Sequence, residues 1–365
     1  MMEITKSLKE AILYYKQGKI SKAINFFESS IFENNNKELV YESLGICYME
    51  KGDYKKSLEN FSKALKINNK NIKSSETLID LLNFVIPESL NDNNILKANE
   101  RILFLNNKIT EEVPSILNIR EILENAYKYS NEFISNINYK QTQIFRRNHE
   151  KLDCNRHFKI FNNFHVIPQF CFSCYKILIV TDNVLELIKL YFLFNQQFME
   201  KSNLRKCMVE VRSKVKNNYK GFIYFKNPGD AEETLSLLKR KIVENNIKIK
   251  NIEIKHGCSE FYDRYPDFKK INFKGEQEMK YNKDWEKFEK DVDRNTIKRS
   301  KEDEVYIGSS LNLLNLSDFL VIKNWLNYAK ILGDTSYKQV FTNYIEDNFL
   351  NKILEKQYDF RKKEF

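Results

Sequence analysis

Hydrophobic positions along the chain follow two different spacings. Up to about residue 137 they recur at the interval typical of amphipathic helices, with breaks near Pro87 and Pro114. From about residue 170, short aliphatic and aromatic runs typical of strands alternate with helical stretches. After a charged stretch, "NLSDFLVIKNWLNYAKILGD" predicts a further helix, capped by Ser317 and stopped by Gly333. The pattern predicts an α+β chain in which helices flank a mixed α/β domain.

The first seventy residues repeat with a period of 34 residues. The stretch "AILYYKQGKISKAINFFESSI" aligns with "GICYMEKGDYKKSLENFSKAL", and the alignment pairs Gly18 with Gly52 and Phe27 with Phe61. Such a period is typical of a helical hairpin, in which small residues let two helices approach and large residues fill the space between them. The sequence therefore predicts two repeats, over residues 4–37 and 38–71.

These repeats resemble the tetratricopeptide repeat. The positions that carry the resemblance are Leu44, Gly45, Tyr48, Gly52, Tyr54, Phe61 and Ala64. The resemblance implies a stack of helices whose concave face binds a peptide or another protein and which has no chemistry of its own. Because two units rarely bury enough core alone, we expect the helical stretches 72–86, 92–105 and 115–137 to continue the stack. A stack that only supports the next domain is the alternative.

The middle of the chain predicts a ferredoxin-like domain. The expected strands are 172–181, 206–215, 219–226 and 248–256, and the expected helices are 183–197 and 229–244. That order, βαββαβ, is the split βαβ arrangement, whose strands lie in the order 4-1-3-2.

Within this domain, "KGFIYFKNPGDAEETLSLL" resembles the third strand and second helix of an RNA-recognition motif. The resemblance implies that Lys220 reaches a phosphate and that the rings of Phe222 and Tyr224 stack on bases. Ile223 and Asn227 depart from the motif. Burial of the two rings beneath another element is the alternative.

Cysteine and histidine gather in the same domain. Of 6 Cys and 4 His, only Cys47 lies outside residues 149–258. The predicted topology brings Cys171, Cys174 and Cys258 to one edge of the sheet. The candidates for a fourth ligand are Cys154, His157 and Cys207. Zinc prefers four thiolate or imidazole ligands, so a zinc site is expected at this edge. An iron–sulfur cluster, unligated structural thiols and a redox dithiol stay open as alternatives.

The net charge is not spread evenly along the chain. The excess of basic over acidic side chains is +2 over residues 1–149, +7 over 150–262 and +1 over 263–365. A basic patch for an acidic partner is one interpretation of the middle segment, and a solvated face with no partner is the alternative. The start of the chain lacks a signal peptide and no apolar run is long enough to span a membrane, which predicts a cytoplasmic protein.

We divide the chain into a repeat stack, 1–148, a basic α/β domain, 149–262, and a charged linker with C-terminal helices, 263–365.

No motif in the sequence supports catalysis. The chain has no Gly-rich phosphate loop, no nucleophile in a known context and no H-E-x-x-H pattern. The sequence therefore predicts a non-enzymatic adaptor, in which a repeat platform for a protein or peptide partner is joined to a metal-stapled α/β domain. RNA binding by the basic sheet, and a zinc or iron–sulfur enzyme with an open metal at the sheet edge, are the alternatives.

Overall fold

The computed structural model describes residues 6–33, 36–88, 93–134, 137, 139–147, 152–196, 204–212, 215–272, 274–294, 308–343 and 348–355. The chain forms two compact units. Unit 1 comprises Met1–Asn107, Asn125–Tyr139 and Ile297–Leu320, and unit 2 comprises Lys108–Glu124, Lys140–Thr296 and Val321–Phe365. The residues after 262 are therefore shared between the two units and do not form a separate third part.

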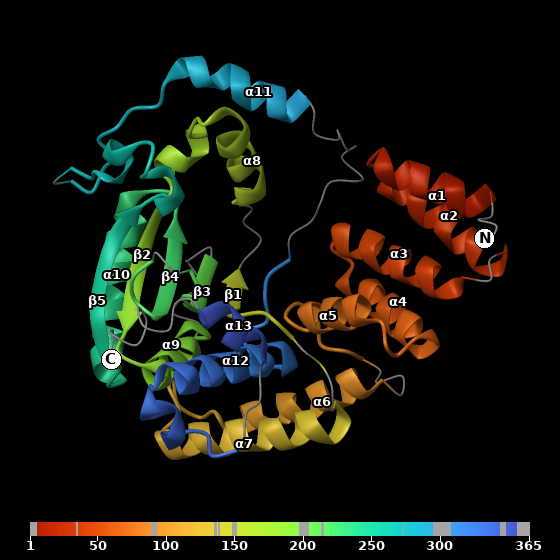
Figure 1. The fold of residues 1–365 in the computed structure, drawn as a ribbon, viewed down its shortest axis with the longest axis horizontal. Helices are drawn as coiled ribbons and strands as arrows, with labels where there is room; N and C mark the ends of the chain where they lie inside the picture. The colour runs from red at the N-terminus through yellow and green to blue at the C-terminus, as the bar shows by residue number, and fades with distance from the viewer. Residues whose placement is uncertain are drawn as a thin grey trace. The chain divides into compact units, whose positions relative to one another are not determined.

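Unit 1 is built from helices, and the first five of them pack on their neighbours in sequence (Figure 1). They are α1(Lys6–Lys16), α2(Ile20–Glu33), α3(Lys37–Glu50), α4(Tyr54–Ile67), α5(Ile72–Leu81) and α6(Asn94–Leu103). Gly18 and Gly52 take φ values of 74° and 77° in the turns that close the first two hairpins, a backbone conformation that favours glycine. The predicted helical repeats are confirmed, and the helix over 72–81 packs on the helix before it, whereas the third predicted stretch, 115–137, is divided between the two units.

The core of this stack contains the residues that carry the repeat pattern. Leu8, Ala11, Phe27, Leu44 and Cys47 form one buried cluster with their neighbours. Cys47, the cysteine outside the middle segment, is therefore a core residue.

Gly45 lets α3 approach α4 closely, so its replacement by alanine should destabilise unit 1. A Cβ at this position would lie 2.7 Å from two ring carbons of Phe61, which is buried. Alanine favours a helix over glycine by about 1 kcal/mol, but overpacking a core costs about 1–3 kcal/mol. We expect a net loss, measured by urea unfolding. Ser43→Ala on the same helix is the control, and a stabilised Gly45→Ala variant would contradict the packing.

Unit 2 contains a five-stranded antiparallel sheet. Its strands are β1(Gln143–Arg147), β2(Tyr175–Thr181), β3(Leu204–Val209), β4(Tyr219–Phe225) and β5(Ile249–His256), in the order β1-β3-β4-β2-β5. The last four have the ferredoxin-like order predicted from the sequence. β1 was not predicted, because "QIFRR" is short and polar; it pairs with β3, with Phe145 opposite Lys206.

Two helices cover one face of this sheet. α9(Val184–Phe194) packs on β2, β3 and β4, and α10(Pro228–Glu244) packs on β2, β4 and β5. A Cβ on Gly221 of β4 would meet Leu190 and Phe194 of α9, so Gly221 and its alternate neighbours face the helices. Lys220, Phe222 and Tyr224 therefore lie on the opposite face.

The remaining described elements complete the two units. They are α7(Ile116–Phe133), α8(Cys154–Phe164), α11(Glu286–Arg294), α12(Leu316–Leu332), α13(Asn348–Leu354) and the short 3-10 helices η1(Phe104–Lys108), η2(Gln169–Ser173), η4(Ser259–Phe261), η5(Pro266–Lys269), η6(Lys283–Trp285) and η8(Thr335–Gln339). α12 ends at Gly333, as predicted. Its N-cap is Asn315 and not Ser317, because the Asn315 side chain accepts the Asp318 amide hydrogen at 3.0 Å. None of the described helices is long and apolar enough to cross a membrane.

Candidate functional site

Unit 1 binds a segment of its own chain, residues 308–315, which forms neither helix nor strand and leads into α12 at Leu316. The Gly308 amide donates to the Tyr54 hydroxyl at 2.9 Å. The Leu314 amide donates to the Asn106 Oδ1 at 2.9 Å, and the Asn106 Nδ2 donates back to the Leu314 carbonyl at 2.8 Å. The Leu316 amide donates to the Asn99 Oδ1 at 3.0 Å. Side chains of three different helical elements thus bind the backbone of this segment.

The paired contact at Asn106 is suited to binding any extended chain. A carboxamide has both a donor and an acceptor, so one side chain satisfies the N–H and C=O of a single residue. Because the contact uses only backbone atoms of the bound segment, it does not depend on which side chain that segment carries. The surface therefore has the chemistry needed to hold an extended peptide.

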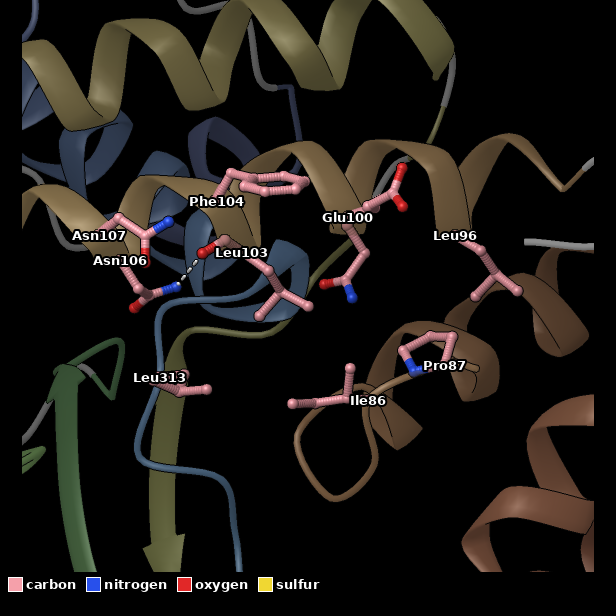
Figure 2. A pocket seen from close by; sticks show the side chains of 10 residues that line it. Ile86, Pro87, Leu96, Glu100, Leu103, Phe104, Asn106, Asn107 and Leu313 are labelled. Atoms are coloured by element: carbon pink, nitrogen blue, oxygen red, sulfur yellow. Dashed lines mark hydrogen bonds between the residues drawn. The ribbon is translucent and has the colours of Figure 1, made fainter. Parts of the chain in front are cut away.

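A pocket of about 410 Å³ lies beside this segment. Figure 2 shows Leu103 and Phe104 on one side, Ile86 and Pro87 on the other, and Leu313 from the bound segment at one end. The remaining lining residues are Leu96, Asn99, Glu100, Asn106 and Asn107. The walls are mainly apolar, with amide groups and one carboxylate among them, as in pockets that bind a side chain and the backbone next to it.

A second hollow, of about 300 Å³, adjoins the first. It shares Ile86 and Pro87 with the first pocket and continues along α4, where Leu58 lies between charged side chains. Those charged residues are Lys55, Glu59, Lys63 and Glu88. Ile86 is half exposed and Phe104 is 63% exposed, so both present apolar surface to solvent. Together the two hollows form a groove for a ligand longer than one residue.

A comparison with protein families identifies part of unit 1. The family model for the tetratricopeptide repeat matches residues 39–71, which contain most of α3, all of α4 and the start of the bend before α5. This segment is a tetratricopeptide repeat. No curated protein matches the chain. The hairpin of α1 and α2 precedes the matched tetratricopeptide repeat by one period, with Gly18 in the place of Gly52.

Four of the predicted metal ligands lie near one another in unit 2. Cys154 begins α8, Cys171 lies in η2, Cys174 precedes β2 and Cys258 follows β5. The Gly257 amide donates to the Cys174 carbonyl at 2.7 Å, which joins the ends of β2 and β5. Burial, followed by the nearby Cys258 thiol, raises the pKa of Cys174 to about 12. Burial raises the pKa of Cys171 and Cys258 as well.

The other two predicted ligands lie in different surroundings. Cys207 is buried in the middle of β3, opposite Gly221, on the face that the helices cover. His157 is buried and its ring stacks on Phe170 with the centroids 5.0 Å apart. Burial, and then Arg156, lower the pKa of His157. Among the described residues no three His, Cys, Asp or Glu side chains are grouped as metal ligands.

The three residues expected to bind RNA lie on the open face of the sheet, but Phe222 and Lys220 are buried and not exposed. Phe222 is only 8% exposed and its ring stacks on Tyr224 at a centroid distance of 6.2 Å. Lys220 is also buried, and its Nζ lies 3.0 Å from the Glu210 Oε2. Lys220 is thus committed to a carboxylate within the protein.

Sequence reasoning missed several residues that the structure places at these sites. Asn99 and Asn106 bind the segment that leads into α12, and Lys176 and Lys206 lie on the open sheet face beside Phe222. The lysines could have been found by strand alternation, since each lies two residues from a buried apolar residue on the same face. The asparagines carry no such signal, because the chain is rich in this residue.

Proposed function

We propose that this protein is an interaction adaptor whose helical unit binds an extended segment of a protein partner in the groove beside Leu313. The main observation behind the proposal is that unit 1 already binds a segment of its own chain. The side chains of Tyr54, Asn99 and Asn106 accept hydrogen bonds from backbone amides of that segment. The tetratricopeptide repeat in the same unit supports it, since such repeats generally bind other proteins.

The groove has features of a peptide site. Its apolar walls, including the exposed Ile86 and Phe104, would bury one large apolar side chain of the partner. The lining carries charges of both signs, and Lys55 pairs with Glu88 at 2.6 Å, so the apolar walls and not a net charge determine which partner segment fits.

A peptide-display selection against the full chain tests this function. We expect enriched peptides to share a large apolar residue and to lose binding by tenfold or more to the Ile86→Glu variant, because a carboxylate would replace the apolar wall. Leu39→Glu, which changes an exposed leucine of α3 outside the groove, is the control and should bind normally. Peptides that bind both variants equally would contradict the proposal.

Asn106→Leu should loosen the bound segment without unfolding unit 1. The substitution removes both hydrogen bonds to Leu314, worth about 1 kcal/mol each, so the amides of Leu314 and Leu316 should exchange with deuterium about tenfold faster or more. Asn107→Leu is the matched control, because the Asn107 side chain lines the same pocket and makes no hydrogen bond to any described residue. Equal exchange in the two variants would show that Asn106 does not hold the segment.

Zinc at the thiols of Cys154, Cys171, Cys174 and Cys258 stays a prediction. What supports it is their shared edge of the sheet; coordination would require the four sulfur atoms to draw together and lose their protons. Elemental analysis of the purified protein tests it. One zinc per chain that is lost in Cys174→Ser would support the metal-stapled domain, and metal-free folded protein would leave the thiols as packing groups.

A further inference from the structure

The open face of the sheet contains a cavity that the proposed function does not use. Its volume is about 460 Å³, and all its lining residues belong to unit 2. The lining residues come from all five strands, from α8 and from the residues that follow β3 and β5. Six basic side chains line it: Lys176, Lys206, Arg212, Lys216, Lys220 and Lys255. Glu260 is the one acidic side chain among the lining residues.

Two of these lysines converge on one ring without a carboxylate partner. The Lys206 Nζ lies 4.9 Å, and the Lys176 Nζ 5.8 Å, from the centroid of the Phe222 ring. Lys176 is 9% exposed. Neither ammonium group makes a hydrogen bond or ion pair with any residue that the structure describes. By contrast, Lys255 pairs with Glu253 at 3.0 Å on the same sheet.

Holding these two ammonium groups together is unfavourable in the free protein. The two like charges lie over the same ring, with the Lys206 Nζ 4.9 Å and the Lys176 Nζ 5.8 Å from its centroid, so they repel each other across a partly desolvated cavity. The ring of Phe222 offsets only part of this cost, since a cation–π contact contributes about 0.5–2 kcal/mol. A doubly charged anion placed between the two groups would offset the rest.

The size and walls of the cavity restrict what the anion can be. The volume suits a small molecule, and the rings of Phe145, Phe222 and Tyr224 provide flat apolar surface next to the two lysines. Phe222 is only 8% exposed, so it cannot stack on successive bases of a strand. One compact ligand with a dianionic group and a planar ring matches this arrangement.

We propose that the cavity binds a nucleoside monophosphate, with its phosphate between Lys176 and Lys206 and its base against the aromatic residues. Lys216 is another lining residue and adds positive charge to the cavity, whereas Arg212 is paired with Glu210 and Glu260. A phosphate monoester carries close to two negative charges at neutral pH on one small group. That charge matches the two converging ammonium groups.

Isothermal titration of the full chain tests the proposal with adenosine 5′-monophosphate, guanosine 5′-monophosphate, adenosine and inorganic phosphate. We expect at least one of the two nucleotides to bind at least tenfold more tightly than adenosine and phosphate do. Phosphate that binds as tightly as both nucleotides would overturn the ring contact. A single-stranded RNA whose affinity rises with length and exceeds that of the nucleotides would overturn the small-molecule assignment. No binding of either nucleotide would also overturn the proposal.

Variants separate a binding role for the lysines from a structural one. Lys176→Met and Lys206→Met should each weaken nucleotide binding at least tenfold, and Lys176→Met should raise the melting temperature of the ligand-free protein, because it removes a buried charge that has no partner. Lys239→Met, on the exposed surface of α10, should change neither. A Lys176→Met variant that melts lower and still binds nucleotide would show that Lys176 only supports the fold.

Discussion

Replacing Glu210 by alanine should lower the free energy of unfolding of unit 2 by about 3–5 kcal/mol, the usual cost of removing one partner from a buried ion pair. The Glu210 side chain is fully buried and lies 3.0 Å from the Lys220 Nζ and 2.8 Å from the Arg212 Nε. Without it, the buried Lys220 would lose the carboxylate that lies 3.0 Å from its Nζ. The same carboxylate keeps Lys220 and Arg212 occupied, which leaves Lys176 and Lys206 as the ammonium groups available to a ligand.

Urea unfolding at several pH values measures this effect. Burial alone would raise the pKa of Glu210, but the hydrogen bond from Arg212 and the charge of Lys220 outweigh it and lower the pKa to about 2. A carboxylate with a lowered pKa stabilises the fold above its unfolded value near 4.5 and loses that effect as the pH falls toward 2. The difference between the parent protein and Glu210→Gln should therefore shrink over that range.

A matched control separates this buried pair from ordinary surface charge. Glu260 accepts from the same arginine at 2.8 Å, but it is 43% exposed. Glu260→Ala should cost less than about 1 kcal/mol, as exposed ion pairs usually do. Equal losses in the two variants would contradict the account of a buried, shared carboxylate.

Gly257→Ala should destabilise the sheet edge that carries the cysteines, by about 2–4 kcal/mol. Gly257 has a φ of 52°, in the left-handed region, and a Cβ there would lie 2.9 Å from the Phe268 Cζ and closer still to its Cε1. Strained φ values cost about 1–3 kcal/mol and overpacking adds a similar amount. Phe268 is fully buried against His256 and Phe261, so its ring cannot move aside.

Thermal unfolding of two alanine variants measures this loss. Gly229→Ala is the control, because a Cβ at the start of α10 would make only an ordinary contact with Asn227, and alanine favours a helix. We expect Gly257→Ala to melt several degrees lower than the parent protein and Gly229→Ala to melt at the same temperature or higher. A Gly257→Ala variant of unchanged stability would mean that the edge can rearrange.

The sequence contained enough to predict the elements and the order of the strands. The period of 34 residues and the glycines at 18 and 52 identified the helical hairpins, because spacing of large and small residues is a local signal. The βαββαβ order gave the sheet order for the same reason. β1 and the N-cap Asn315 were missed, since both depend on contacts with distant parts of the chain: β1 exists by pairing with β3, and Asn315 donates to Leu82 and Asn83.

The candidate sites were harder to predict than the fold. Cysteine is rare in the chain, so the positions of the cysteines relative to the predicted strands pointed to one edge of the sheet. Cys207 is an exception, because it faces the helices. The hydrogen bonds between Asn106 and Leu314 join residues 208 positions apart, and asparagine is common throughout the sequence, so no local pattern indicates this contact. The pairing of Lys220 with Glu210 likewise depends on the hairpin geometry, so only the structure distinguishes this lysine from Lys176 and Lys206.

Site-specific photo-crosslinking tests the central claim, that the groove beside Leu313 binds a protein partner. Benzoylphenylalanine would replace Phe104 in the groove or, as the control, Phe32 of α2, which is 92% exposed and outside it. In cells that make the protein, we expect position 104 to crosslink to a defined partner, and the selected apolar peptides to compete with that product, while position 32 gives no such product. The same products from both positions, or none from position 104, would contradict the account.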